Sequence, residues 1–246
     1  MDTSTITHTH PTLRAATAAA ALLATLAAAT AAGAAPVTVE RFKEVGSADV
    51  NGDRLPDRLV QQERSGGSVW HVKLATRAGV SIRQQWAELT TPDVQTVGFA
   101  DVNGDRRADL ILQYDQDGVR RWQVHLSTGT RFQAGGDWAE APSTDLTVVG
   151  FADADGDGLN DLFLQYDRGG VRRWQVRTST GRGFEDSGDW VDVELGAYDV
   201  AALRLRDVNG DRRADLVLRY DDRHGRSHQR TLLSTGSRFV APGLLR

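Results

Sequence analysis

Residues 98–110 read Gly98-Phe99-Ala100-Asp101-Val102-Asn103-Gly104-Asp105-Arg106-Arg107-Ala108-Asp109-Leu110. A nine-residue loop rich in Asp, Asn and Gly lies between two apolar stretches. These residues favour turns because their side chains bond the nearby backbone and glycine accepts a positive φ. The apolar stretches on both sides predict two antiparallel strands joined by the loop.

The same loop recurs along the chain at a nearly fixed period. Its first aspartates are separated by 52, 52 and 54 residues, and they are Asp49, Asp101, Asp153 and Asp207. Two tryptophan series keep a period of 52, namely Trp70, Trp122, Trp174 and Trp86, Trp138, Trp190. Such periodicity indicates a repeat architecture. We expect one repeat domain over residues 35–246, with repeats at about 37–86, 87–138, 139–190 and 191–246.

Each repeat predicts one small antiparallel sheet. In the third copy we expect strands at 147–152, 161–166, 171–178 and, less regularly, 184–190, with a turn at 167–170. Trp174, Val176 and Thr178 alternate with polar residues, which is the period-two pattern of a strand. In the fourth copy Gln229 takes the place of Trp122 and Leu245 the place of the second tryptophan.

A small sheet cannot bury its apolar face alone, so adjacent copies must stack. The expected fold class is therefore all-β: a propeller-like array of four repeats of about 52 residues, each four-stranded. The ring could have four blades, or two chains could each supply half of an eight-bladed ring. A linear solenoid is less favoured because the first and last copies retain consensus apolar positions rather than becoming polar caps.

Composition excludes several classes of protein. The chain has 246 residues, 29 Lys and Arg against 33 Asp and Glu, and no cysteine. The slightly acidic balance argues against a nucleic-acid partner. The absence of cysteine excludes a disulfide framework and a thiolate metal site.

Residues 1–34 resemble a signal peptide. A weakly hydrophobic, alanine-rich segment follows Arg14, and the small residues around Ala34 suit cleavage after that position. The alternative is an uncleaved membrane anchor. We therefore expect a secreted, extracellular protein with no membrane span after cleavage.

The acidic loops have the chemistry of metal sites. Side-chain oxygens at loop positions one, three, five and nine, with the carbonyl at position seven, can converge on one hard cation, and calcium fits better than magnesium. An ordinary Asp/Asn/Gly turn is the alternative, although such a turn does not require the carboxylate at position nine. Up to four structural Ca²⁺ ions are thus expected on Asp49, Asn51, Asp53, Leu55, Asp57; Asp101, Asn103, Asp105, Arg107, Asp109; Asp153, Asp155, Asp157, Leu159, Asp161; Asp207, Asn209, Asp211, Arg213 and Asp215.

This pattern resembles the FG-GAP and VCBS repeats of integrin-alpha propellers and of many secreted bacterial proteins. The resemblance covers roughly residues 37–246 and implies calcium bound between the strands of a propeller blade. The family often has glycine at loop position six, which here is present only as Gly158. If that position requires a positive φ, each arginine that replaces the glycine adds strain of about 1 kcal/mol. Related rings commonly have seven or eight blades.

The sequence contains no recognisable catalytic motif, so we do not expect an enzyme. A calcium-binding module for adhesion to glycan or extracellular protein surfaces is the leading interpretation. Stacking of sugar rings on Trp86, Trp138 and Trp190 is one hypothesis for the ligand site, with packing as the alternative. A secreted polysaccharide-active lyase or hydrolase, and a purely structural module that closes a ring as a homodimer, are the other candidates.

Overall fold

The computed structural model describes residues 42–81, 83–91, 93–143, 146–194, 199–222 and 224–242. All of them belong to one compact unit, Glu40–Arg246. The expected signal peptide, residues 1–34, lies outside the described residues. No helix occurs among the described residues, so none of them forms a helical membrane span. The described chain is all-β, as expected.

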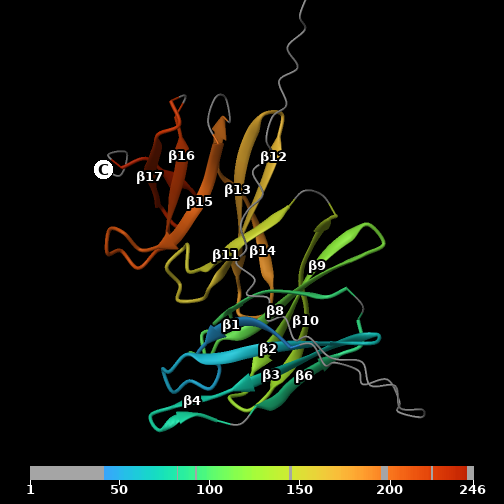
Figure 1. The fold of residues 1–246 in the computed structure, drawn as a ribbon. Coiled ribbons are helices and arrows are strands. Elements are labelled where there is room, and N and C mark those ends of the chain that lie inside the picture. Colours follow the sequence, from blue (N-terminus) through green and yellow to red (C-terminus); the bar gives the residue numbers. More distant parts are fainter. Residues whose placement is uncertain are drawn as a thin grey trace, which may run out of the picture. The chain divides into compact units, whose positions relative to one another are not determined.

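Four four-stranded antiparallel sheets follow one another along the chain (Figure 1). In the first sheet the order is β1 (Phe42–Ala48), β2 (Asp57–Arg64), β3 (Gly67–Lys73) and β6 (Gln84–Leu89), with a small hairpin of β4 (Ala75–Thr76) and β5 (Gly79–Val80). The second sheet has β7 (Gln95–Ala100), β8 (Asp109–Gln116), β9 (Val119–Ser127) and β10 (Phe132–Pro142). The third has β11 (Thr147–Ala152), β12 (Asp161–Arg168), β13 (Val171–Ser179) and β14 (Phe184–Glu194). The fourth has β15 (Asp199–Arg206), β16 (Asp215–Asp221), β17 (Ser227–Ser234) and β18 (Phe239–Val240).

The strands expected in the third copy are confirmed, with longer hairpins. β12 continues to Arg168 and pairs with β13 up to Val171, so the turn is tighter than expected. β14 continues to Glu194, which pairs with Val171. Trp190 consequently lies inside the last strand rather than at its end.

The hydrophobic core is divided into three clusters, each formed by residues of two successive sheets. The second strand of an inner sheet contributes core residues to both faces of that sheet. In β8, Leu110 and Leu112 pack toward the first sheet, whereas Ile111 packs toward the third. Burial of both faces explains the continuous apolar run in this strand, because alternation requires one solvated face. Trp70, Trp122 and Trp174 are fully buried in these clusters, which fits packing rather than ligand binding.

Hydrogen bonds between loops repeat at each junction of two sheets. The amides of Ala108, Asn160 and Ala214, at loop position eight, donate to the position-one carbonyl of the preceding loop at 2.6–3.0 Å. One buried serine per junction also donates its hydroxyl to the position-two carbonyl of that loop. These serine bonds are Ser127 to Val50, Ser179 to Val102 at 2.7 Å and Ser234 to Ala154 at 2.6 Å. Successive sheets are thus joined by buried polar contacts as well as by apolar packing.

We predict that Ser179→Ala lowers the free energy of unfolding by about 1–3 kcal/mol, because a buried carbonyl loses its donor. Ser187→Ala, on the exposed part of β14, should change it by less than about 0.5 kcal/mol. Urea denaturation of both variants checks this prediction. Equal effects of the two substitutions would contradict the role given to Ser179.

Candidate metal centre

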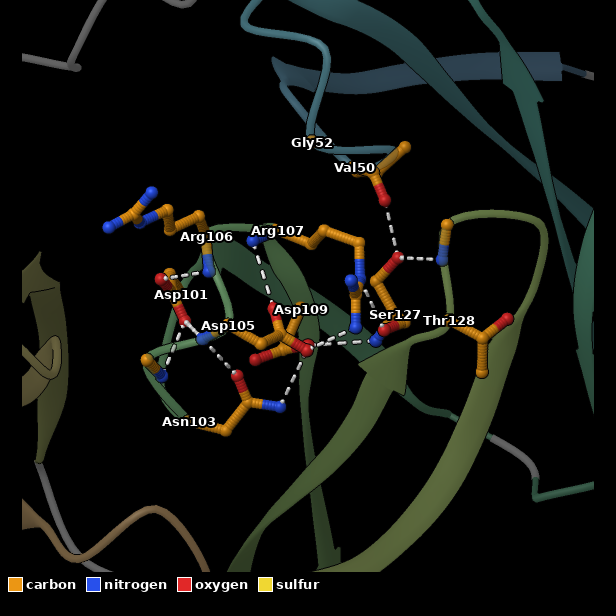
Figure 2. Close-up of polar contacts among 12 residues, drawn as sticks. Val50, Gly52, Asp101, Asn103, Asp105, Arg106, Arg107, Asp109, Ser127 and Thr128 are labelled. Atoms are coloured by element: carbon orange, nitrogen blue, oxygen red, sulfur yellow. Dashed lines mark hydrogen bonds and ion pairs between the residues drawn. The ribbon is translucent and has the colours of Figure 1, made fainter.

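The carboxylate at position one organises each acidic loop. Asp101 accepts the amide of Gly104 on Oδ1 at 2.7 Å and the amide of Arg106 on Oδ2 at 2.7 Å (Figure 2). The equivalent bonds form at Asp49, Asp153 and Asp207, at 2.6–2.9 Å. The side chains at positions three and five make similar bonds. Asn103 Oδ1 accepts a hydrogen bond from the amide of Asp105, and Asp105 Oδ1 accepts one from the amide of Arg107. The side chains at these positions therefore curl the loop backbone around a shared centre.

Position six adopts a left-handed conformation in all four loops. Arg54, Arg106 and Arg212 have φ of 68°, 67° and 69°, and Gly158 has φ of 91°. This confirms that the position requires a positive φ. Each arginine therefore carries strain of about 1 kcal/mol that Gly158 avoids.

We predict that Arg106→Gly leaves stability unchanged or raises it by up to about 1 kcal/mol, because relief of strain offsets the added flexibility of the unfolded chain. Gly158→Ala, the reverse change in the third loop, should lower stability by about 1 kcal/mol. Chemical denaturation in chelator measures both effects without any contribution from a metal. A loss of stability in Arg106→Gly larger than in Gly158→Ala would contradict this account.

The aspartate at position nine fastens the loop to its own sheet. Asp161 is fully buried, and it accepts the amide of Ala154 on Oδ2 at 2.7 Å and that of Ser179 on Oδ1 at 2.8 Å. Asp57, Asp109 and Asp215 are equally buried and make the same pair of bonds. This bonding corrects the expectation that a plain turn has no use for position nine, because the carboxylate has a structural role that needs no metal.

Burial removes water from around these carboxylates and so disfavours their charged form. Desolvation raises the pKa of Asp109 and that of Asp161 to about 7, and neighbouring loop carboxylates add to the shift. It also raises the pKa of Asp57. The two backbone amides at Asp57, Asp109 and Asp161 lower the pKa without cancelling the rise. A nearby cation would stabilise the charged form.

The third loop brings three carboxylates together. Asp153, Asp155 and Asp161 each offer an oxygen within 4.8 Å of the others. Oxygens this close together could act as ligands of one metal ion. A carboxylate oxygen that accepts one hydrogen bond retains capacity for a second partner. Asp157 stands outside the cluster and accepts the amide of Leu159 at 2.8 Å.

In the second and fourth loops, an arginine side chain pairs with the carboxylate at position five. Arg107 donates to Asp105 Oδ2 at 2.5 Å, and Arg213 to Asp211 Oδ2 at 2.7 Å. Arg107 also donates from Nε to the carbonyl of Ser127 at 3.0 Å and lies against Gly52 of the preceding loop (Figure 2). The expected position-five ligand is thus neutralised by the side chain at position seven. Leu55 and Leu159 hold position seven in the first and third loops, so no such pair can form there.

The structure corrects the stacking hypothesis for the second tryptophan series. Trp86, Trp138 and Trp190 are 3%, 7% and 3% exposed. Their rings pack at 5.2–5.3 Å against Phe132, Phe184 and Phe239 of the next sheet. A sugar ring would need an exposed aromatic face, so these side chains serve packing between sheets.

A surface set that the sequence analysis missed recurs on two sheets. Tyr166 donates its hydroxyl to Asp189 at 2.7 Å, and Arg173 lies beside both, with Nε 3.6 Å from Asp189. Tyr114, Asp137 and Arg121 form the same set on the second sheet. We call these two groups the tyrosine–arginine sets. The sequence carries a signal for both sets, because tyrosine, arginine and aspartate each recur at a spacing of 52 residues.

The comparisons with known proteins add no family. No protein-family model matches the chain, and no curated protein matches it significantly.

Proposed function

We propose that this chain is a secreted, calcium-stabilised β-repeat protein that acts as a binding or adhesion module for glycan or protein surfaces. The cluster of Asp153, Asp155 and Asp161 carries the metal part of the proposal. The likeness of all four loops to FG-GAP and VCBS repeats supports it. Face-to-face packing of successive sheets, with contacts between their first strands, supports a propeller-like stacking of blades.

The loops differ in how well they suit a divalent ion. The third has a carboxylate at position three, glycine at position six and no arginine at position seven. The second and fourth each have strain at position six and an arginine on the position-five carboxylate. We therefore rank the third loop as the strongest calcium site, the first as intermediate, and the second and fourth as weakest.

We predict that calcium raises the unfolding temperature, since an ion that binds only the folded state stabilises it by about 2.7 kcal/mol at a hundredfold excess over Kd. Asp155→Ala should remove much of this rise. It also removes the hydrogen bond that Asp155 accepts from the amide of Asp157 at 3.1 Å, so the unfolding temperature in chelator should fall by a smaller amount. Asp155 suits this test better than Asp161, which also holds two buried amides.

Thermal unfolding in calcium and in chelator measures this effect, with Glu185→Ala on the exposed side of β14 as the control. Wild-type protein that is indifferent to calcium would show that the acidic loops are only turns. An equal calcium response in Asp155→Ala would remove the third loop from the proposal.

The tyrosine–arginine sets are the best-supported surface for a ligand. Each combines a half-buried tyrosine ring with an arginine and an aspartate. The exposed part of the ring can contact a sugar or a polar protein surface, and the charged groups can hydrogen-bond to it. The two sets stand at equivalent positions of neighbouring sheets, which suits a ligand with repeating units.

We predict that Tyr114→Ala combined with Tyr166→Ala weakens binding to any polysaccharide retained by the wild-type protein by at least about tenfold, which is about 1.4 kcal/mol. A glycan array followed by calorimetry measures the effect, with Glu185→Ala again as the control. Unchanged affinity would move the ligand site elsewhere. Conversion of a polysaccharide into shorter products would instead favour the polysaccharide-active enzyme, the second candidate.

A further inference from the structure

The contact between successive sheets is directional. We call the face that a sheet turns toward the preceding sheet its leading face, and the opposite one its trailing face. The leading side donates two hydrogen bonds, from the amide at loop position eight and from the serine that ends the third strand. The trailing side accepts them on the carbonyls of loop positions one and two. A leading face with both donors therefore satisfies both carbonyls of the trailing face that it meets.

The first sheet has neither donor. Pro56 stands at loop position eight and has no N–H, and Ala75 stands where Ser127 and Ser179 stand and has no hydroxyl. The backbone at this point is otherwise conventional, because Ala75 still donates its amide to Asp57 at 2.8 Å, as Ser127 does to Asp109. Only the groups that would reach a preceding sheet are missing.

The apolar residues of the leading face are also replaced in the first sheet. Leu110, Leu162 and Leu216 are fully buried against the preceding sheet, whereas the equivalent Arg58 is exposed. Val80 takes the place of the buried Phe132 and is 57% exposed. A cation and a truncated side chain thus stand where the other sheets have their core residues.

The trailing face of the fourth sheet also has exposed or polar residues at positions that are buried and apolar in the other sheets. Val208 is 44% exposed, although Val50, Val102 and Ala154 at the same loop position are fully buried. Gln229 is exposed and pairs with Arg219 in the register position where the buried Trp174 pairs with Gln165. Thr231 replaces Val176 two residues later.

These replacements correct the expectation that the first and last copies retain the consensus apolar positions. We propose that these two faces are caps, so that the four sheets form an open array that neither closes into a ring nor pairs head to tail with a second copy of the chain. Closure through the contact used inside the array would bury the Arg58 guanidinium and the Gln229 amide. It would also leave the carbonyls of Asp207 and Val208 without the donors that their counterparts have. Buried polar groups without partners oppose association. The observations behind this inference do not involve metal, so it stands independently of the calcium proposal.

Paired substitutions at one loop position test the open array. Val208→Asp places a charge on the proposed free face, whereas Val102→Asp places it in the junction between the second and third sheets. In the open array Val208→Asp leaves the unfolding temperature unchanged and Val102→Asp lowers it strongly. Val102→Thr provides a measurable midpoint if the aspartate variant does not fold.

The comparison is made in calcium and in chelator, and light scattering gives the molar mass of the wild-type protein. We expect the mass of a single chain at every concentration. A stable dimer whose mass falls on Val208→Asp substitution would overturn the proposal in favour of a ring shared by two chains. A monomer in which Val208→Asp destabilises as much as Val102→Thr would overturn it in favour of a four-bladed ring.

Discussion

Burial of both faces of the inner sheets is the constraint on which the rest of the structure depends. A four-stranded sheet of this size has too little apolar surface on one face to offset the entropy of ordering its chain. At each junction, leucines of one sheet pack against tryptophans of the preceding sheet and add the apolar burial that a single sheet lacks. The individual sheets are therefore not independent folding units, and stability accumulates from one junction to the next.

The acidic loops are the polar counterpart of that packing. Backbone turns at the edge of a junction leave amides and carbonyls that must be satisfied once water is excluded. The buried aspartate at position nine satisfies two amides of its own sheet, and the serine after it satisfies a carbonyl of the preceding one. One loop thus connects the turn, its own sheet and the neighbouring sheet, which explains why the pattern recurs wherever two sheets meet.

The same loops differ in their electrostatics. Concentrated carboxylates need a compensating cation, and the chain offers two solutions. Arg107 and Arg213 place a guanidinium on the position-five carboxylate, so the second and fourth loops are partly neutral by themselves. The third loop has three converging carboxylates and a leucine at position seven, so a cation from solution would have to neutralise its charge. Near-identical loop sequences consequently lead to different expectations for metal binding.

The sequence by itself determined the β class and the strands of the third copy, whereas the positive φ at loop position six was only a condition that the structure then showed to hold. The β class and these strands follow from local rules, namely residue alternation and turn chemistry. It did not determine what the tryptophans do, because Trp190 has the same composition around it whether its ring meets a sugar or Phe239. It also misjudged position nine, since the two amides that Asp161 accepts come from residues 7 positions before it and 18 positions after it. Only the tertiary structure decided these points, because burial and hydrogen-bond partners depend on which sheet lies opposite, and the sequence of one repeat does not contain that information.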